Sequence, residues 1–154
     1  MAFLYDFEPQ AGTTYNLGGV SYSFDLDRRL VKVSTDKVVR GVRWDYVNRA
    51  YPQKIPGFDY GHVGGIEAFG TNDILLQTRG GFPQAAAMNR VGAWRVAEEA
   101  SNGIVFRLQS LGLEFNKVAE VRNFVNGVPS EWRLYVESAG SLVFDSGWLK
   151  ANLP

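Results

Sequence analysis

Histidine is the side chain used most widely in acid–base catalysis, and this sequence contains a single histidine, His62. It lies in the run Asp59-Tyr60-Gly61-His62, and no nucleophile-elbow pattern stands near it. A catalytic triad would have to be built on this one residue. Because a lone loop histidine is more often a structural hydrogen-bonding group than a catalyst, we expect no catalytic residue and no enzymatic activity.

Asp25 and Asp27 lie two residues apart in an alternating stretch, which places both side chains on one face of a strand. A pair of carboxylates can serve glycoside hydrolysis or bind calcium. Arg28, Arg29 and Lys32 follow closely, so we favour a solvated strand face of mixed charge. The single histidine and the absence of cysteine exclude zinc sites of the usual ligand sets, disulfides and thiol catalysis. We predict no metal and no cofactor.

Aromatic side chains gather within residues 44–60. Tyrosine and tryptophan combine a flat apolar face with a polar group, which suits sugar rings and protein partners alike. In the alternative interpretation, Trp44 and Tyr46 belong to the core of a strand, because large aromatic residues occupy cores first. The predicted binding residues are Trp44, Tyr46, Tyr51, Phe58, Asp59, Tyr60 and His62.

Glycine and proline interrupt residues 49–73, where regular periodicity is missing. A loop of this length is uncommon inside a compact domain and is usually functional or mobile. Exposed aromatic side chains mark interfaces, so we expect this loop to contact a neighbouring subunit or a surface glycan.

Two stretches alternate apolar and polar residues with the period of two that is typical of strands. Residues 20–27 and 30–34 predict a hairpin connected by two arginines, with an apolar face made by Val20, Tyr22, Phe24 and Leu26. Residues 131–148 predict a second hairpin, whose buried face starts with Trp132, Leu134 and Val136.

One helical signal stands at residues 83–91, where proline suits a first turn and a run of alanines propagates it. Residues 94–100 and 104–108 flank Asn102-Gly103, a dipeptide typical of hairpin turns, and predict two further strands. The alternative that residues 90–100 form one helix stays open, because the acidic residues there suit either state.

The length fits one domain across residues 1–154. Aromatic residues make up 14% of the chain and there are 17 glycines, which favours strands and turns over helices. Six or more short strands indicate a mainly β fold. We predict an antiparallel β-sandwich or jelly-roll-like domain with one short helix near residues 83–91.

Basic and acidic residues number 16 each, so the formal net charge is zero. Polyanion binding needs a surplus or a clustering of positive charge, so we expect no nucleic-acid partner. The N-terminus has no basic region, and no apolar run approaches the roughly 20 residues of a membrane span. We therefore expect neither a signal peptide nor membrane insertion.

The C-terminal hairpin carries a strand, a small turn and an apolar pair before Asp-Ser, through Leu134, Tyr135, Val136, Gly140, Leu142, Val143, Phe144, Asp145 and Ser146. This pattern, which covers under a fifth of the chain, resembles a hairpin of minor tail and tail-tip proteins of long-tailed bacteriophages. The resemblance implies a structural or host-surface-binding role and no enzymatic one.

These observations favour a non-enzymatic bacteriophage protein that is assembled in the host cytoplasm into the tail or tail tip of the virion. Its partners would be other virion proteins or copies of itself. The alternative is a carbohydrate-binding module that binds a host-surface glycan through the loop aromatics. A hydrolase is a third hypothesis, for which the sequence offers Asp25, Asp27, Asp59, His62 and Glu67 without a recognisable spacing.

Overall fold

Two long antiparallel strands, β6 (Asn116–Val125) and β7 (Val128–Ser138), form the centre of the structure. Along β7 the side chains alternate, and the buried ones include Trp132, Leu134 and Val136. That alternation assigns one face of the sheet to the core and the other to a wetter environment. The structure is a computed structural model that describes residues 9–38, 58–60, 83–85, 92–125 and 128–151.

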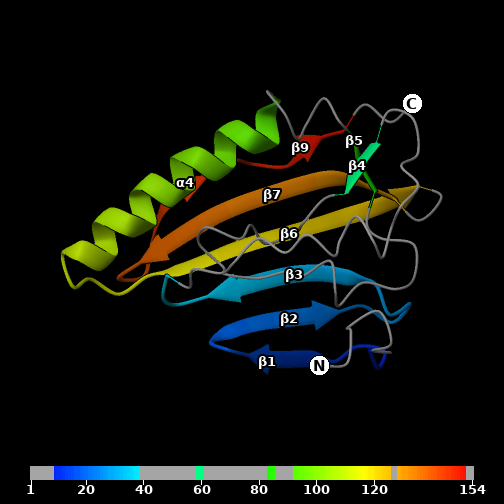
Figure 1. The fold of residues 1–154 in the computed structure, drawn as a ribbon, viewed down its shortest axis with the longest axis horizontal. Coiled ribbons are helices and arrows are strands. Elements are labelled where there is room, and N and C mark those ends of the chain that lie inside the picture. The colour runs from blue at the N-terminus through cyan, green and yellow to red at the C-terminus, as the bar shows by residue number, and fades with distance from the viewer. Residues whose placement is uncertain (1–8, 39–57, 61–82, 86–91, 126–127, 152–154) are drawn as a thin grey trace.

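Seven antiparallel strands pair in the order β1-β2-β3-β6-β7-β8, with β9 also pairing with β7 (Figure 1). The order leaves β1 at one edge of an open sheet, and β8 and β9 at the other. The prediction of a mainly β, antiparallel fold is confirmed. The remaining strands of this sheet are β1 (Thr14–Leu17), β2 (Val20–Phe24), β3 (Leu30–Thr35), β8 (Ser141–Asp145) and β9 (Leu149–Lys150).

A separate antiparallel pair consists of β4 (Phe58–Tyr60) and β5 (Pro83–Ala85). β5 contacts β7. Figure 1 places this pair at the end of the large sheet where β7 begins. The pair therefore adjoins the central strand although it belongs to another sheet.

These two short strands correct two predictions from the sequence. Phe58–Tyr60 is a strand within the stretch predicted as a long loop at residues 49–73, and the rest of that stretch lies outside the described residues. The helix predicted at residues 83–91 is wrong in its first part, because Pro83–Ala85 pairs as a strand. Residues 86–91 lie outside the described residues.

Helix α4 (Ala93–Ser110) packs against β7. Its buried residues recur every three to four positions, the period of a helix with one face on a core: Trp94, Ala97, Ser101 and Val105. The helix ends in a Schellman motif. Gly112 has φ 69°, and its N–H donates to the carbonyl of Gln109 at 3.0 Å. The N–H of Leu113 donates to the carbonyl of Leu108, also at 3.0 Å.

The two strands predicted on either side of Asn102-Gly103 are wrong, because this dipeptide lies inside α4. The alternating apolar residues there are only half-buried, namely Ile104, Phe106 and Leu108. The alternative of a helix at residues 90–100 is closer to the structure. No helix that the structure describes has the length and apolarity needed to cross a membrane.

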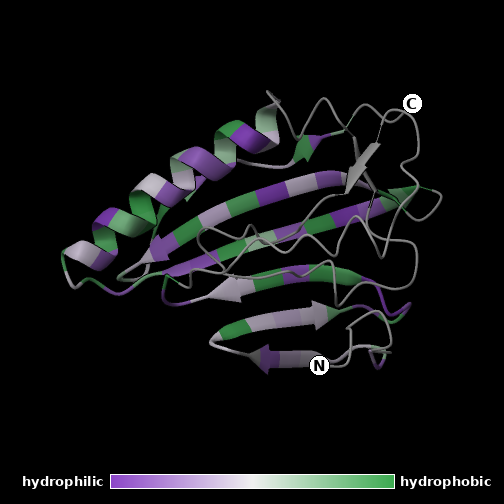
Figure 2. Ribbon diagram, viewed as in Figure 1, coloured by the Kyte–Doolittle hydropathy of each residue, from purple (hydrophilic) through white to green (hydrophobic). Residues whose placement is uncertain are grey.

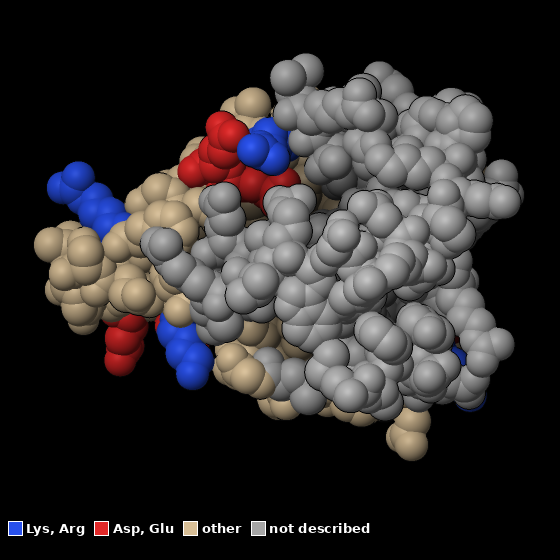
Figure 3. Space-filling view, viewed as in Figure 1, with Lys and Arg blue, Asp and Glu red and all other residues tan. Residues whose placement is uncertain are grey.

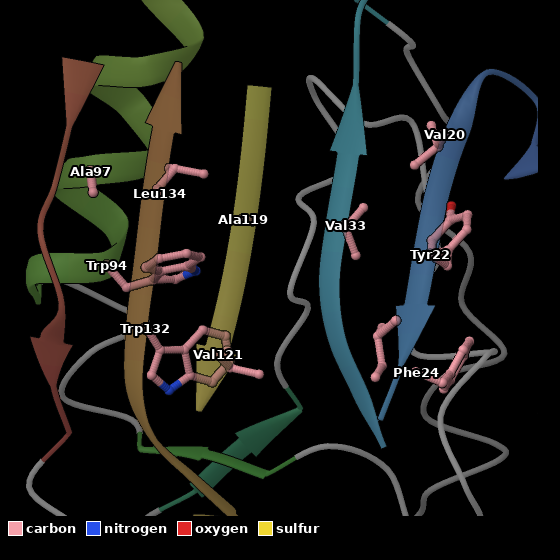
Figure 4. Close-up of a cluster of buried hydrophobic side chains, with 11 residues drawn as sticks. Val20, Tyr22, Phe24, Val33, Trp94, Ala97, Ala119, Val121, Trp132 and Leu134 are labelled. Atoms are coloured by element: carbon pink, nitrogen blue, oxygen red, sulfur yellow. The ribbon is translucent and has the colours of Figure 1, made fainter. Parts of the chain in front are cut away.

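The core lies between α4 and the buried face of the sheet (Figure 4). The rings of Trp94 and Trp132 meet edge to face, with centroids 5.1 Å apart and planes at 61°. Both are buried, and an aromatic contact of this kind adds to the stabilisation from burial. Figure 2 shows hydrophobic and hydrophilic residues alternating along the strands of the sheet. Farther from α4, the same cluster includes Val20, Tyr22 and Phe24 of β2.

Both predicted hairpins are present in the structure. The hairpin predicted at residues 20–34 is confirmed as β2 and β3. Leu26, which the sequence pattern placed on the buried face, is 83% exposed because β2 ends before it. The C-terminal hairpin predicted at residues 131–148 is confirmed as β7 and β8. Its turn is made by Ala139 and Gly140, both with positive φ.

Candidate functional site

Three of the predicted binding residues lie in the part of the chain that the structure describes, and all three are in strand β4. β4 consists of Phe58, Asp59 and Tyr60, and the register sets Asp59 opposite Gln84 of β5. For these three residues the structure describes the backbone. The other predicted binding residues lie outside the described residues, namely Trp44, Tyr46, Tyr51 and His62.

The stretch of chain that contains His62 lies in sequence between β4 and α4, and β5 lies within it. In sequence, His62 follows Tyr60, the last residue of β4, by two positions. β4 pairs with β5, which contacts β7, and Trp94 in the first turn of α4 packs on Trp132 of β7. The stretch therefore begins at β4, which is attached to β7 through β5, and ends at α4, which packs on β7.

Glu98 is a half-buried carboxylate on this part of α4. It lies one helical turn after Trp94 and shares a helix side with the buried Ser101, so it borders the face that packs on the sheet. Glu99 is instead exposed, and its Oε1 accepts a hydrogen bond from Nε of Arg95 at 3.0 Å. The sequence analysis gave Glu98 no site role, because its position becomes informative only once this stretch is known to be a helix.

On the opposite face of the sheet, Arg133 holds two carboxylates together. Its Nε and Nη2 donate to Oδ1 and Oδ2 of Asp145 at 3.0 and 2.9 Å. Its Nη1 donates to Oε1 of Glu120 at 3.3 Å, and its guanidinium carbon lies 4.4 Å from the ring centroid of Tyr135. This bidentate geometry is typical of strong arginine–carboxylate pairs.

The pKa shifts in this cluster favour the charged forms of Arg133 and Asp145. The hydrogen bond from Arg133 lowers the pKa of Asp145, and the same bond raises the pKa of Arg133. Burial, followed by the charge of Glu120, raises the pKa of Tyr135. These shifts move each group away from titration near neutral pH, so the cluster acts as a structural clamp between strands and not as an acid–base site.

Asp25 and Asp27 are both bound to Arg29. Nε of Arg29 donates to Oδ2 of Asp25 at 2.9 Å, and Nη2 donates to Oδ2 of Asp27 at 3.2 Å. Oδ1 of Asp25 also accepts the backbone N–H groups of Asp27 and Arg29, both at 2.9 Å. The mixed charge of that interpretation is confirmed by these ion pairs. The predicted strand face is wrong, because β2 ends at Phe24 and both carboxylates lie in the turn between β2 and β3. Within the described ranges, no group of three or more potential metal-ligating side chains occurs.

A further cluster, the Arg122 platform, consists of Arg122, Trp148 and Glu131. The guanidinium carbon of Arg122 lies 3.8 Å from the ring centroid of Trp148, and its Nη2 lies 3.3 Å from Oε1 of Glu131. Arg122 and Glu131 face each other across β6 and β7. Trp148 is brought there by β9, which pairs with β7. No local pattern in the sequence signals that pairing, so the sequence analysis missed the platform.

No family model matches the sequence, and no curated protein matches it. Among solved structures, the fold is similar to that of NucA from Streptococcus agalactiae, whose crystal structure has a magnesium ion bound. The TM-score is 0.51 at 12% sequence identity, and the likeness covers 86% of this chain and 69% of that chain. At this identity the likeness concerns the fold, and the resemblance to phage tail proteins stays a prediction.

Proposed function

We propose that this chain is a magnesium-dependent hydrolase of phosphodiester bonds in nucleic acid. The observation that carries the proposal is the fold shared over 86% of the chain with NucA, whose crystal structure holds magnesium. Magnesium in enzymes is usually held by one or two carboxylates together with the phosphates of the substrate. The magnesium ion in that protein therefore supports a phosphate ester as the substrate proposed for this chain, and nucleic acid is a polymer of phosphodiesters.

The residues around the stretch between β4 and α4 fit such an ion by their chemistry, because magnesium takes oxygen ligands. Glu98 on α4 supplies a half-buried carboxylate at the edge of this stretch. When bound, the ion supplies positive charge that polarises the phosphate. In sequence, the stretch also contains four residues with side-chain oxygens, namely Glu67, Asn72, Asp73 and Asn89.

We assign His62 as the general base. An imidazole is the side chain best suited to accept a proton near neutral pH. His62 is the single histidine of the chain and lies two positions after the last residue of β4 in sequence. In the proposed reaction, it takes a proton from the water that attacks the phosphorus. The bond from phosphorus to the leaving oxygen then breaks, the leaving oxygen takes a proton from solvent, and the new phosphate group keeps the oxygen of that water.

The expectation of no nucleic-acid partner rested on the net charge of zero. Figure 3 shows acidic and basic side chains intermixed on the described part of the visible face. A bound divalent cation is often the largest local charge in a site, so a phosphodiesterase does not need a basic surface overall. The proposal thus departs from the expectation of a non-enzymatic chain. The virion and glycan-binding roles stay predictions, because the fold does not test them.

The test is cleavage of plasmid DNA and of RNA with magnesium, and with EDTA in its place. We expect cleavage by the wild-type chain only with magnesium. We expect a loss of about 100-fold or more in His62→Ala, because general base catalysis contributes about that much. Glu98→Gln should lose activity, whereas Glu99→Gln on the exposed side of the same turn should keep it. Wild-type chain that leaves both substrates intact with magnesium would overturn the proposal.

A further inference from the structure

Arg122 lies over the ring of Trp148 and yet remains half exposed. Its guanidinium carbon is 3.8 Å from the ring centroid, and its Nη2 reaches Glu131 at 3.3 Å. The side chain of Arg122 is 49% exposed, whereas that of Glu131 is 13% exposed. Glu131 also accepts a hydrogen bond from Nδ2 of Asn123. A planar cation is therefore fixed in orientation with part of its surface toward solvent.

Two other arginines lie on aromatic rings, and their charges are compensated differently. Arg29 lies 4.0 Å from the ring centroid of Phe124 and is paired with two aspartates. Arg133 lies 4.4 Å from that of Tyr135 and is paired with Asp145 and Glu120. Each of these arginines meets two carboxylates.

Arg122 meets one carboxylate, that of Glu131. The exposed Lys150 stands opposite Glu131 in the register of β9 with β7. Among the three stacked arginines of the described residues, Arg122 is therefore the one with a local excess of positive charge.

The platform lies at one end of the sheet, on the face opposite α4, because Glu131 precedes Trp132 on β7 and Trp132 packs on Trp94 of α4. Arg122 is near the end of β6, and Glu131 is near the start of β7. Figure 1 shows β9 and the β4–β5 pair near that same end. The platform and the half-buried Glu98 of α4 therefore lie on opposite faces of the sheet, and the platform is a separate surface.

We propose that Arg122, held on Trp148, binds an unpaired base of a nucleic-acid strand. Bases stack on guanidinium planes as they do on aromatic rings, and the edge of the guanidinium pairs with phosphate oxygens. Because Trp148 and Glu131 already order the side chain, little rotamer entropy is lost on binding. Stacking needs a base whose flat face is open, so the preferred substrate is single-stranded. This inference rests on the proposed function and names its substrate class.

The experiment measures binding without cleavage, by the fluorescence anisotropy of a labelled single-stranded oligonucleotide and of its duplex in EDTA. Loss of one stacked base corresponds to a loss of affinity of about fivefold to a hundredfold. We expect the Kd of Arg122→Ala for the single strand to rise by about tenfold, with a smaller change for the duplex. Arg122→Lys keeps the charge but loses the plane, so it should recover little. Arg95→Ala is the matched control, because Arg95 pairs with Glu99 on α4 at 3.0 Å and is similarly exposed.

An unchanged Kd in Arg122→Ala would overturn the platform, and magnesium-dependent cleavage by the same variant would leave the proposed function intact. The reverse result, oligonucleotide binding that depends on Arg122 in a chain that cleaves nothing, would support the platform and sink the hydrolase. A purely structural role would lower the melting temperature of Arg122→Ala without moving the Kd, and this also counts against the platform. Binding of a glycan in place of the oligonucleotide, lost in Arg122→Ala, would likewise overturn the nucleic-acid assignment.

Discussion

Ser146, which lies between β8 and β9, is joined to Leu134 of β7 by two hydrogen bonds. The backbone N–H of Ser146 donates to the carbonyl of Leu134 at 2.9 Å, and the N–H of Leu134 donates to Oγ of Ser146, also at 2.9 Å. The hydroxyl in turn donates to the carbonyl of Gly147 at 2.7 Å. A side-chain oxygen therefore takes the place of a backbone acceptor where the edge of the sheet passes from β8 to β9.

Ser146→Ala should destabilise the fold by about 1–3 kcal/mol, because it leaves the N–H of the buried Leu134 without its acceptor. Chemical denaturation measures this free energy of unfolding directly. Ser141→Ala, at an exposed position at the start of β8, serves as the control and should change stability by about 0.5 kcal/mol or less. Equal effects of the two substitutions would contradict the role given to the hydroxyl.

Leu134 and Leu142 belong to the same hairpin but differ in burial. Leu134 is 1% exposed and Leu142 is 53% exposed. Leu134→Ala should therefore cost about 2–5 kcal/mol of stability, through lost burial and the cavity that remains. Leu142→Ala should cost less than about 1 kcal/mol. The midpoints of urea unfolding compare the two, and a large cost at Leu142 would refute the assigned faces.

The sequence predicted β2, β3 and the C-terminal hairpin because each has one buried face, which imposes the alternation that the pattern detects. The same kind of pattern gave a wrong prediction of strands where α4 forms. Ile104, Phe106 and Leu108 also alternate, and Asn102-Gly103 has the composition of a hairpin turn. The helix forms nonetheless, because its buried face against β7 outweighs the weak local preferences of that dipeptide.

The candidate site was less predictable than the fold. The aromatic run pointed to Asp59 and His62, but their neighbours depend on how β4 and β5 attach to β7. The Arg122 platform depends on the short strand β9 pairing near the start of β7. Contacts of this kind join residues distant in sequence, and periodicity carries no information about them.

Stability should depend on pH through Asp145. Its pKa is lowered by the hydrogen bond from Arg133, so the ionised form stabilises the fold above the ordinary value of 3.8. That contribution is lost as the pH falls through the lower pKa of the folded state. Asp145→Asn should cost on the order of 1 kcal/mol at pH 7, since the pair is partly exposed and screened.

Unfolding in urea at pH 7 and at pH 3 measures this change. The difference between the wild type and Asp145→Asn should shrink at pH 3, where the wild-type carboxyl loses part of its charge. Ser141→Ala, which changes no titratable group at an exposed position, should differ from the wild type equally at both pH values. A difference that grows toward low pH would contradict the lowered pKa.

A substitution at Gly103 tests whether the chain forms the helix or the hairpin that the sequence had predicted. Gly103 lies within α4, it is exposed, and a Cβ placed on it would meet no atom within 4 Å. Gly103→Ala should therefore stabilise the chain by about 0.5–1 kcal/mol, because alanine favours helix and restricts the unfolded state. Gly112→Ala also meets open space, but Gly112 has φ 69° at the end of the helix. It should destabilise by about 1 kcal/mol or more.

Thermal and urea unfolding of the two variants measure these opposite signs. A hairpin turn at Asn102-Gly103 would require positive φ at Gly103, and alanine would then be unfavourable at both glycines. Stabilisation at Gly103 together with destabilisation at Gly112 is thus expected only if the chain is helical through Gly103 and ends the helix at Gly112. Loss of stability in both variants would return these residues to a turn, and with it remove Glu98 from the helix face on which the proposed metal site depends.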